Sequence, residues 1–503
     1  EPVKSSCVAS HGGELLEAND TWFRPVDLLQ GPDGCVYVVD FYDRRAAHLD
    51  PVDNWDKTNG RIYRIEYMGG PDYPRDLDLR KKTTAELLEL LKHPNVWYRR
   101  EARQLLAAIL DKPTAKTLWK WVSEGNTQLC LEAIWTLYTA GGDTERITSE
   151  AVGHSDPVIR TWGIRLKADH PEMLRDVGRL FAHAALSQER SSIVLAQLAC
   201  SAKRVRPHEA GMTAIQLLSN PVVRDDPALQ LLCWWALESA ITRGSDTWFE
   251  RFELRSETDP ALDLITERIA RRLSAGDVKG WDGQLLEVMQ MRSQRDPAPV
   301  LRGIVKGLEG GAMKAFPAKV MNTLRSIHKR QPQPSAELAL EILARLNDET
   351  AIETFLVRVA NAELPDAERL GAMNLMKQLR PPMAEAVFLR EFENSKSDAL
   401  RVGLLNVLEA YPDPKIGQTI LAAYPGSSAA VKKRSVQLLL SRPAWAVALF
   451  KALDAGTFPK TDVSVDQARV AVSLADKDLT ALVEKHFGKV APATAGEKQA
   501  RIS

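Results

Sequence analysis

Charged side chains that could hold a ligand gather around the turn signals of the first part of the chain. The candidates are Arg24, Asp27, Asp40, His48 and Arg61, which flank a Gly-Pro-Asp-Gly turn and two β-rich segments. At strand ends such groups can face a shared site and bind a cofactor, an anion or calcium. The alternative is that they form turns and salt bridges within the sheet, as Pro-Asp-Gly segments commonly do. These five residues are the candidate cofactor site, and no residue is assigned a catalytic role.

A second set of residues could bind a protein partner. Nine of the 12 tryptophans lie between Trp97 and Trp281, and aromatic and arginine side chains dominate interface hot spots. The alternative is that the rings fill a helical core or anchor the sheet, while the arginines form a solvated face or salt bridges between domains. The candidate docking residues are Trp97, Arg99, Arg100, Arg103, Trp119 and Trp121.

Other patterns with chemistry are missing from the sequence. The five cysteines are widely spaced with no Cys-x-x-Cys pair, and no two histidines lie at metal-ligand spacing. There is no phosphate loop and no nucleophile elbow. We therefore expect neither a metal site nor a cofactor held by this chain alone.

The charge balance bounds the partners. Lys+Arg and Asp+Glu both number 66, and a formal net charge of zero argues against nucleic-acid binding. No apolar run is long enough for a transmembrane helix. The start, Glu1 to Ser5, lacks a signal peptide's basic and apolar regions, and the chain opens as if in the middle of a longer protein.

The elements that must position these residues change type once. The first domain, residues 1–70, is predicted to be β over 20–67, with strands at Cys35–Asp40 and Gly60–Tyr67 around a polar loop. Residues 71–82 form a linker. Helices begin at residue 83, with a threonine cap before Thr84–Leu91 and a second helix over Asn95–Leu110. Since two or three strands are not stable alone, this sheet is expected to belong to a larger one.

A repeat runs through the helical region, 83–490. The shared frame returns at steps of 31, 30 and 30 residues and later at steps of 32 and 31. A small residue three places after the arginine lets helices approach closely, and the arginine can pair with an acid or a carbonyl. The period drifts between 205 and 330, and 491–503 is predicted to be a linker toward a further domain. The frame positions are Arg99, Cys130, Arg160, Arg190, Arg369, Arg401 and Lys432.

These features predict a mostly α protein: a HEAT-like α-solenoid following a small β segment. Three segments carry a family resemblance: Asn19–Asp27, Gly31–Tyr42 and Gly60–Ile65. They resemble the end of the β-propeller in large bacterial membrane-bound dehydrogenase-like proteins of planctomycetes and verrucomicrobia. That propeller is similar to those of quinoprotein sugar dehydrogenases. The stretch from His486 to Arg501 resembles the region before the family's cytochrome c domain.

The resemblance implies a piece of an exported redox protein, periplasmic or membrane-associated. Most of the propeller and the haem motif are not in this sequence, so a pyrroloquinoline quinone, with or without calcium, and haem c are implied only for the complete protein. The leading hypothesis is a helical spacer and docking module whose partners are the propeller, the cytochrome domain and other proteins. One alternative is an interaction scaffold with no redox role. The other is part of a quinone-dependent sugar or alcohol dehydrogenase whose site lies in the propeller.

Overall fold

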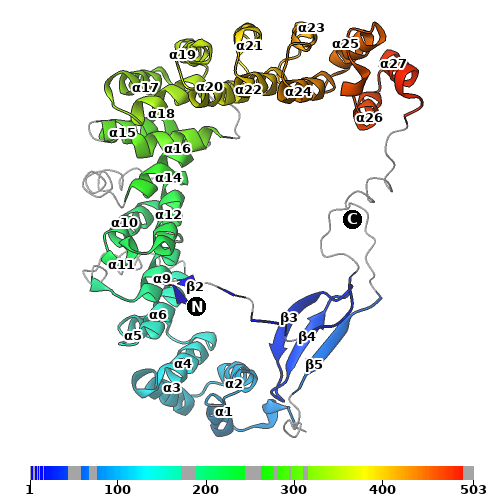
Figure 1. The fold of residues 1–503 in the computed structure, drawn as a ribbon. Helices are drawn as coiled ribbons and strands as arrows, with labels where there is room; N and C mark the ends of the chain where they lie inside the picture. Colours follow the sequence, from blue (N-terminus) through cyan, green and yellow to red (C-terminus); the bar gives the residue numbers. More distant parts are fainter. Residues whose placement is uncertain are drawn as a thin grey trace. The chain divides into compact units, whose positions relative to one another are not determined.

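The fold is that of a computed structural model of the 503-residue chain (Figure 1). It describes residues 2–3, 6–7, 9–10, 12–14, 16–43, 58–66, 76–170, 188–243, 262–276, 278, 280–293, 296–309 and 315–490. His48 and the predicted linker at 491–503 lie outside these residues. The chain divides into two compact units: Glu1–Arg272 with Asp277–Lys279, and Leu273–Gly276 with Gly280–Ser503.

The first unit begins with a small antiparallel sheet of the strands β3 (Pro25–Gln30), β4 (Val36–Asp40) and β5 (Arg61–Ile65), in that order. β3 and β4 are joined by the predicted Gly-Pro-Asp-Gly turn, where Gly34 has a φ of 80°. Two short strands, β1 (Pro2–Val3) and β2 (Ser6–Cys7), pair separately. The sequence of β3 does not alternate between apolar and polar residues, and a strand at Pro25–Gln30 was not predicted.

Both faces of this sheet expose apolar side chains. Leu28 lies opposite Val38, whereas Ile62 lies opposite Val39 on the other face. Leu28 is 65% and Ile62 is 70% exposed, while Val38 is 3% exposed. The sheet therefore has little core of its own.

The rest of the first unit is helical. A single 3-10 turn, η1 (Leu79–Lys81), precedes the first helix. The helices are α1 (Thr84–Leu90), α2 (Val96–Ala108), α3 (Lys112–Glu124), α4 (Thr127–Thr139), α5 (Thr144–Val152), α6 (Pro157–Ala168), α9 (Ser192–Ala202), α10 (Pro207–Leu218), α11 (Pro221–Arg224), α12 (Pro227–Thr242) and α14 (Asp263–Ser274), which ends in the second unit.

The second unit continues with stacked helices. These are α15 (Trp281–Ser293), α16 (Ala298–Leu308), α17 (Ala318–Arg330), α18 (Ser335–Arg345), α19 (Glu349–Ala360), α20 (Asp366–Leu379), α21 (Ala384–Asn394), α22 (Asp398–Leu408), α23 (Pro414–Ala423), α24 (Ala429–Leu439), α25 (Pro443–Asp454), α26 (Val465–Ser473) and α27 (Lys477–Phe487), with the 3-10 turn η4 (Lys460–Asp462) before α26.

The helices begin where the sequence supplies caps. Thr83 and Glu86 form a capping box at α1, because each side chain bonds the other's backbone N–H. Asn95 caps α2 and Asp156 caps α6, where Pro157 takes the first helical position. Local sequence therefore determines where these helices begin.

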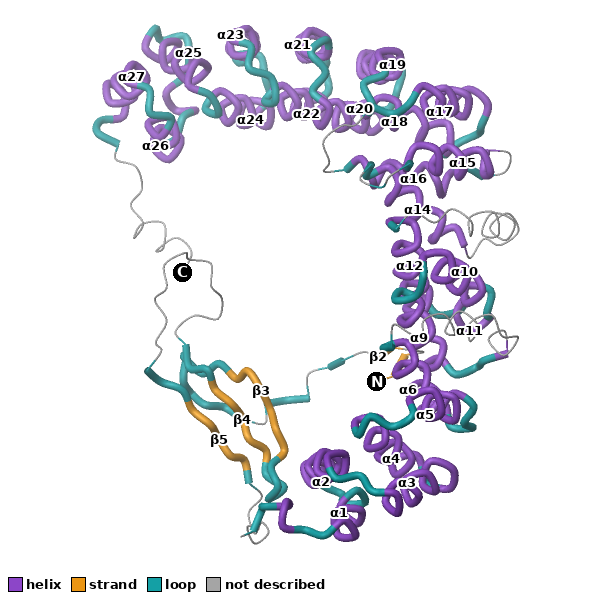
Figure 2. Tube along the Cα trace, turned by 180° about the vertical axis from the view of Figure 1, so that it is seen from behind, coloured by secondary structure: helices purple, strands orange, loops and turns teal. Residues whose placement is uncertain are grey.

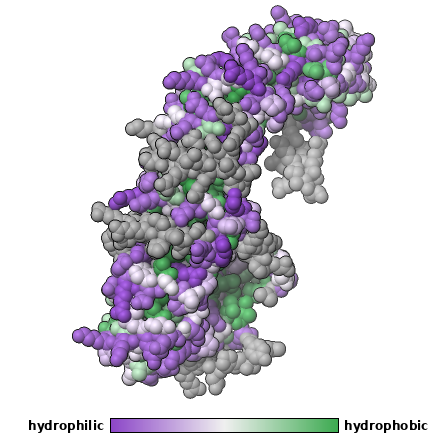
Figure 3. Space-filling model, turned by 90° about the vertical axis from the view of Figure 1, so that its left-hand side faces the viewer, coloured by the Kyte–Doolittle hydropathy of each residue, from purple (hydrophilic) through white to green (hydrophobic). Residues whose placement is uncertain are grey.

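Within each unit the helices form two layers (Figures 1 and 2). In the second unit α20, α22 and α24 contact one another in sequence, and α19, α21, α23 and α25 form the other row. In the first unit α2, α4, α6, α9 and α12 pack in the same way, with α3, α5 and α10 as the other layer. Hydrophilic residues cover most of the coloured surface in the side view, and hydrophobic ones form smaller patches (Figure 3).

The repeat frame coincides with one layer. Arg99 lies on α2, Cys130 on α4 and Arg160 on α6, and later frame positions lie on α20, α22 and α24, whereas Arg190 lies just before α9. The small residue after the arginine is buried, as Ala102 and Gly163 show. The fold class is therefore confirmed: the protein is mostly α, with stacked helix pairs following a small antiparallel sheet. The sheet's origin in a propeller stays a prediction.

Candidate functional site

The predicted cofactor residues of the sheet lie mostly at one end, where Asp40 on β4 is opposite Arg61 on β5. Asp40 is 2% exposed, and its Oδ1 accepts hydrogen bonds from the backbone N–H groups of Arg24, at 2.7 Å, and Tyr42, at 2.9 Å. Its Oδ2 is buried with no hydrogen-bond partner among the described residues. One carboxylate does not make a calcium site, which takes six or more oxygen ligands.

The other two described candidates of this set are used locally. Arg61 Nη1 lies 3.2 Å from Asp20 Oδ2, and its guanidinium stacks 3.8 Å from the centroid of the Tyr42 ring. The backbone N–H of Trp22 and the charge of Arg61 lower the pKa of Asp20. Asp27 is exposed, and its Oδ1 accepts the backbone N–H of Leu28 at 2.8 Å. The structure thus brings Arg24, Asp40 and Arg61 to one end and leaves Asp27 apart.

The predicted docking arginines belong to a bracing pattern at the repeat turns. Arg99 Nη1 donates to the carbonyls of His93, at 2.6 Å, and Pro94, at 2.8 Å, and its Nε donates to Glu132 at 3.2 Å. Two repeats later Arg160 makes the same contacts. Its Nη1 donates to the carbonyls at 154 and 155, and its Nε and Nη2 hold Glu189 at 3.2 and 3.1 Å. Each brace ties one turn to the following part of the stack.

A groove of about 480 Å³ lies on the layer formed by α2, α4 and α6. We call it the arginine–tryptophan groove. Three arginines from one face of α2 line it, opposite a single buried carboxylate and two indole rings. Its defining residues are Arg99, Arg100, Arg103, Glu132, Trp135 and Trp162.

Charge in this groove is unbalanced. Glu132 is 3% exposed and is held by Arg99 and, at 2.8 Å, by Arg103 Nη1. Arg100 is exposed and makes no hydrogen bond or ion pair with the described residues. Three guanidinium groups therefore meet one carboxylate, which leaves a net positive charge beside an aromatic surface.

The aromatic surface consists of two rings from neighbouring helices. Trp135 and Trp162 stack edge to face with centroids 4.9 Å apart. Arg103 lies 5.0 Å from the centroid of Trp135. The Nε1 of Trp135 is buried and has no hydrogen-bond partner among the described residues. Trp135 and Trp162 were not predicted as site residues, although Trp135 follows Arg103 by 32 residues, one repeat step.

The three tryptophans predicted to dock a partner do not line the groove. Trp97, Trp119 and Trp121 are half-buried and pack against the apolar core of the first repeats. The ring of Trp119 is covered by Arg146, whose guanidinium carbon is 4.0 Å from its centroid. The packing of these three rings agrees with the alternative interpretation, in which the tryptophans fill the helical core.

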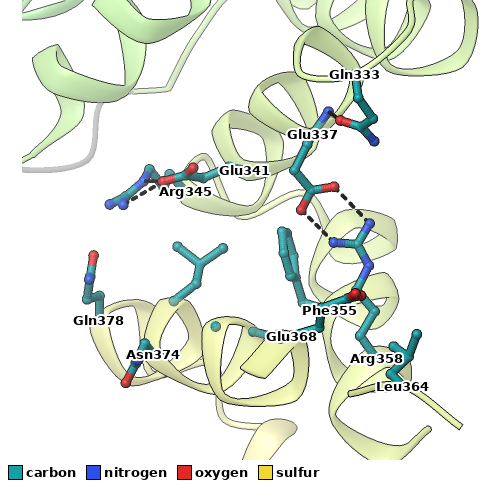
Figure 4. Close-up of a pocket in the computed structure, with 13 residues that line it drawn as sticks. Gln333, Glu337, Glu341, Arg345, Phe355, Arg358, Leu364, Glu368, Asn374 and Gln378 are labelled. Atoms are coloured by element: carbon teal, nitrogen blue, oxygen red, sulfur yellow. Dashed lines mark hydrogen bonds and ion pairs between the residues drawn. The ribbon is translucent and has the colours of Figure 1, made fainter. Parts of the chain in front are cut away.

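A second concave site, of about 640 Å³, lies between α18, α19 and α20 in the second unit (Figure 4). Its charges are largely paired: Glu337 holds Arg358 through two bonds of 2.5 and 2.9 Å. Glu341 similarly lies 2.7 Å from Arg345 Nη2. In Figure 4 the first pair joins α19 to α18 and the second lies along α18, so both arginines of this pocket are paired and its remaining charge is the acidic Glu368.

Comparison with known proteins adds one match. Residues 3–69 match a family described as a domain of unknown function (DUF7133), which spans the sheet and the segments around it. No curated protein matches the chain. No described helix is long and apolar enough to cross a membrane. Among the described residues, no three or more His, Cys, Asp or Glu side chains gather as metal ligands.

Proposed function

We propose that this chain is the helical-repeat spacer and docking module of an exported, dehydrogenase-like redox protein. In that protein it positions a β-propeller relative to a cytochrome c domain. The module acts by geometry, since stacked repeats contact only their neighbours and hold their two ends at a set separation.

The observation that carries the proposal is how the sheet is attached. Asn95, the cap of α2, donates from its Nδ2 to the carbonyl of Gly31 at 2.8 Å. The turn of the sheet is thus bonded to the first repeats, while Leu28 and Ile62 leave both of its faces exposed. A sheet of three short strands with exposed apolar side chains on both faces buries little, and further strands would extend it. A larger sheet completed here would be held at the start of the helical stack.

The first experiment is to read the parent gene on both sides of this chain. The proposal expects propeller strands upstream and a Cys-x-x-Cys-His haem motif downstream. A gene with neither would overturn it.

The second experiment removes one repeat from the parent protein. Deleting 366–397 takes out α20, α21 and one frame step while leaving the flanking repeats whole. Reduction of the haem by the propeller's substrate should slow, whereas reduction of a soluble dye should be unchanged. Equal haem reduction in both proteins would show that the helical region does not set the distance.

A second candidate function is an interaction scaffold with no redox role. The arginine–tryptophan groove favours it, because open guanidinium and indole groups are typical of interface hot spots. Absence of the haem motif from the parent gene, combined with partner binding at the groove, would select this candidate.

A further inference from the structure

We infer that the arginine–tryptophan groove binds an acidic peptide segment of a protein partner, with a carboxylate on the arginines and an apolar side chain on the indole pair. This goes beyond the proposed function, because it holds whether or not the protein has a redox role.

The charges of the groove select the sign of the ligand. Arg99 and Arg103 share Glu132, and Arg99 also donates to two backbone carbonyls. Arg100, one residue along α2 from Arg99, has no counter-charge among the described residues. A carboxylate beside it would meet two guanidinium groups with only one buried acid nearby. Guanidinium forks bind carboxylates through paired, charge-assisted hydrogen bonds.

The aromatic surface selects a peptide over a small anion. Trp135 and Trp162 are only half-buried, so part of each ring remains open to an apolar side chain. A ligand with a carboxylate and an apolar side chain matches both the open guanidinium and the open ring surface.

The pocket of the second unit provides a contrast. Its arginines, Arg345 and Arg358, each hold a glutamate on the pocket wall, so an incoming carboxylate would have to displace one. A nucleic acid is disfavoured at the groove because binding it takes an extended basic surface, whereas the whole chain has zero formal net charge.

The test is fluorescence anisotropy with the full chain and a short labelled peptide in which glutamate and leucine alternate. The matched probe replaces glutamate by glutamine. The acidic peptide should bind, and its affinity should fall between about 50 and about 300 mM salt, because salt screens exposed charges. No binding of the acidic peptide, or equal binding of the glutamine peptide, overturns the inference.

Two variants and one control locate the site. Arg100→Glu should weaken binding by at least about tenfold, the loss expected for an arginine hot spot. Trp135→Ala removes the open part of the indole ring and should weaken binding by a smaller factor. Lys116→Glu makes the same charge change at an exposed position of α3, outside the groove, and should bind as the unchanged protein does.

The outcomes are distinguishable from misfolding because Arg100 and Lys116 are both exposed, and circular dichroism melts check each variant. If Lys116→Glu weakens binding as much as Arg100→Glu, only long-range charge is at work and the groove is not the site. Tighter binding of a single-stranded RNA of the same length would replace the acidic peptide by a nucleic acid.

Discussion

The close approach of α5 and α6 gives the sharpest test of the packing. Gly163, in the middle of α6, faces the end of α5. A Cβ added there would lie 2.7 Å from the backbone nitrogen of Val152 and 2.8 Å from the Cβ of Ala151. Carbon atoms normally approach no closer than about 3.5 Å, so the backbone of α5 would have to shift.

The magnitude follows from two opposing terms. Replacing a helical glycine by alanine stabilises a helix by about 1 kcal/mol. Overpacking a close contact costs about 1–3 kcal/mol, and backbone cannot rotate away as a side chain can. Taking the upper value, we expect Gly163→Ala to lower the free energy of unfolding by about 2 kcal/mol.

The control is a glycine in the same kind of setting without the contact. Gly371 lies in α20, two residues after the frame arginine, and an added Cβ would meet nothing within 4 Å. Gly371→Ala should therefore stabilise its helix by about 0.5–1 kcal/mol.

Hydrogen exchange followed by mass spectrometry measures both changes locally, so the two units need not unfold together. Peptides from α5 and α6 should exchange faster in Gly163→Ala, and peptides from α20 more slowly in Gly371→Ala. If Gly163→Ala protects α5 and α6 instead, the proposed interlock of these helices is refuted.

Three further changes test other contacts. Arg369→Met should destabilise the second unit by about 3 kcal/mol in urea unfolding, because it breaks the buried pair with Glu391 at 3.1 Å and leaves that carboxylate only a 3.4 Å contact with the exposed Arg390. Adding Glu391→Leu should restore most of the loss, and no recovery would contradict the pairing. Asn95→Ala and Asn126→Ala each remove a helix cap worth about 1 kcal/mol. Only Asn95→Ala should speed hydrogen exchange in the turn between β3 and β4, because only Asn95 bonds the sheet. Equal exchange of that turn in the two variants would mean that the bond is not formed. The pKa of Glu86 is held below its usual 4.5, chiefly by the backbone N–H at the cap of α1, so its contribution is present above that pH and is lost as pH falls through the folded value. The protection factors of the α1 amides, which correct for the slower intrinsic exchange at low pH, should fall on acidification in the unchanged protein and change less in Glu86→Gln. Parallel pH profiles would argue against the capping box.

Much of the fold could be predicted from the sequence because it is decided locally. Thr83 and Asn95 are cap residues whose neighbours show helical periodicity, and α1 and α2 begin directly after them. The repeat frame likewise predicted a stack of helix pairs, since a mostly basic position and a small residue three places later recur at steps of about 31 residues. The bond of the frame arginine to turn carbonyls, seen at Arg99 and Arg160, follows from its place one turn into the helix.

The groove could be predicted only in part, because it depends on how neighbouring helices are staggered. Arg99, Arg100 and Arg103 share one helix and were predicted together. Trp135 and Trp162 come from different helices, and their ring contact depends on helix rotation that no local pattern fixes. At the sheet, the role of Asp40 depends on the backbone path around it, which spacing alone does not reveal.

The braces at Arg99 and Arg160 have a mechanical consequence. Each one joins a turn to a glutamate 33 or 29 residues further on, so it spans a repeat boundary with charged bonds as well as apolar contacts. Under tension applied along the stack, a repeat cannot peel away until the brace behind it breaks. We expect this part of the chain to unfold under force in steps larger than a single repeat, because the ion pairs of neighbouring braces break together.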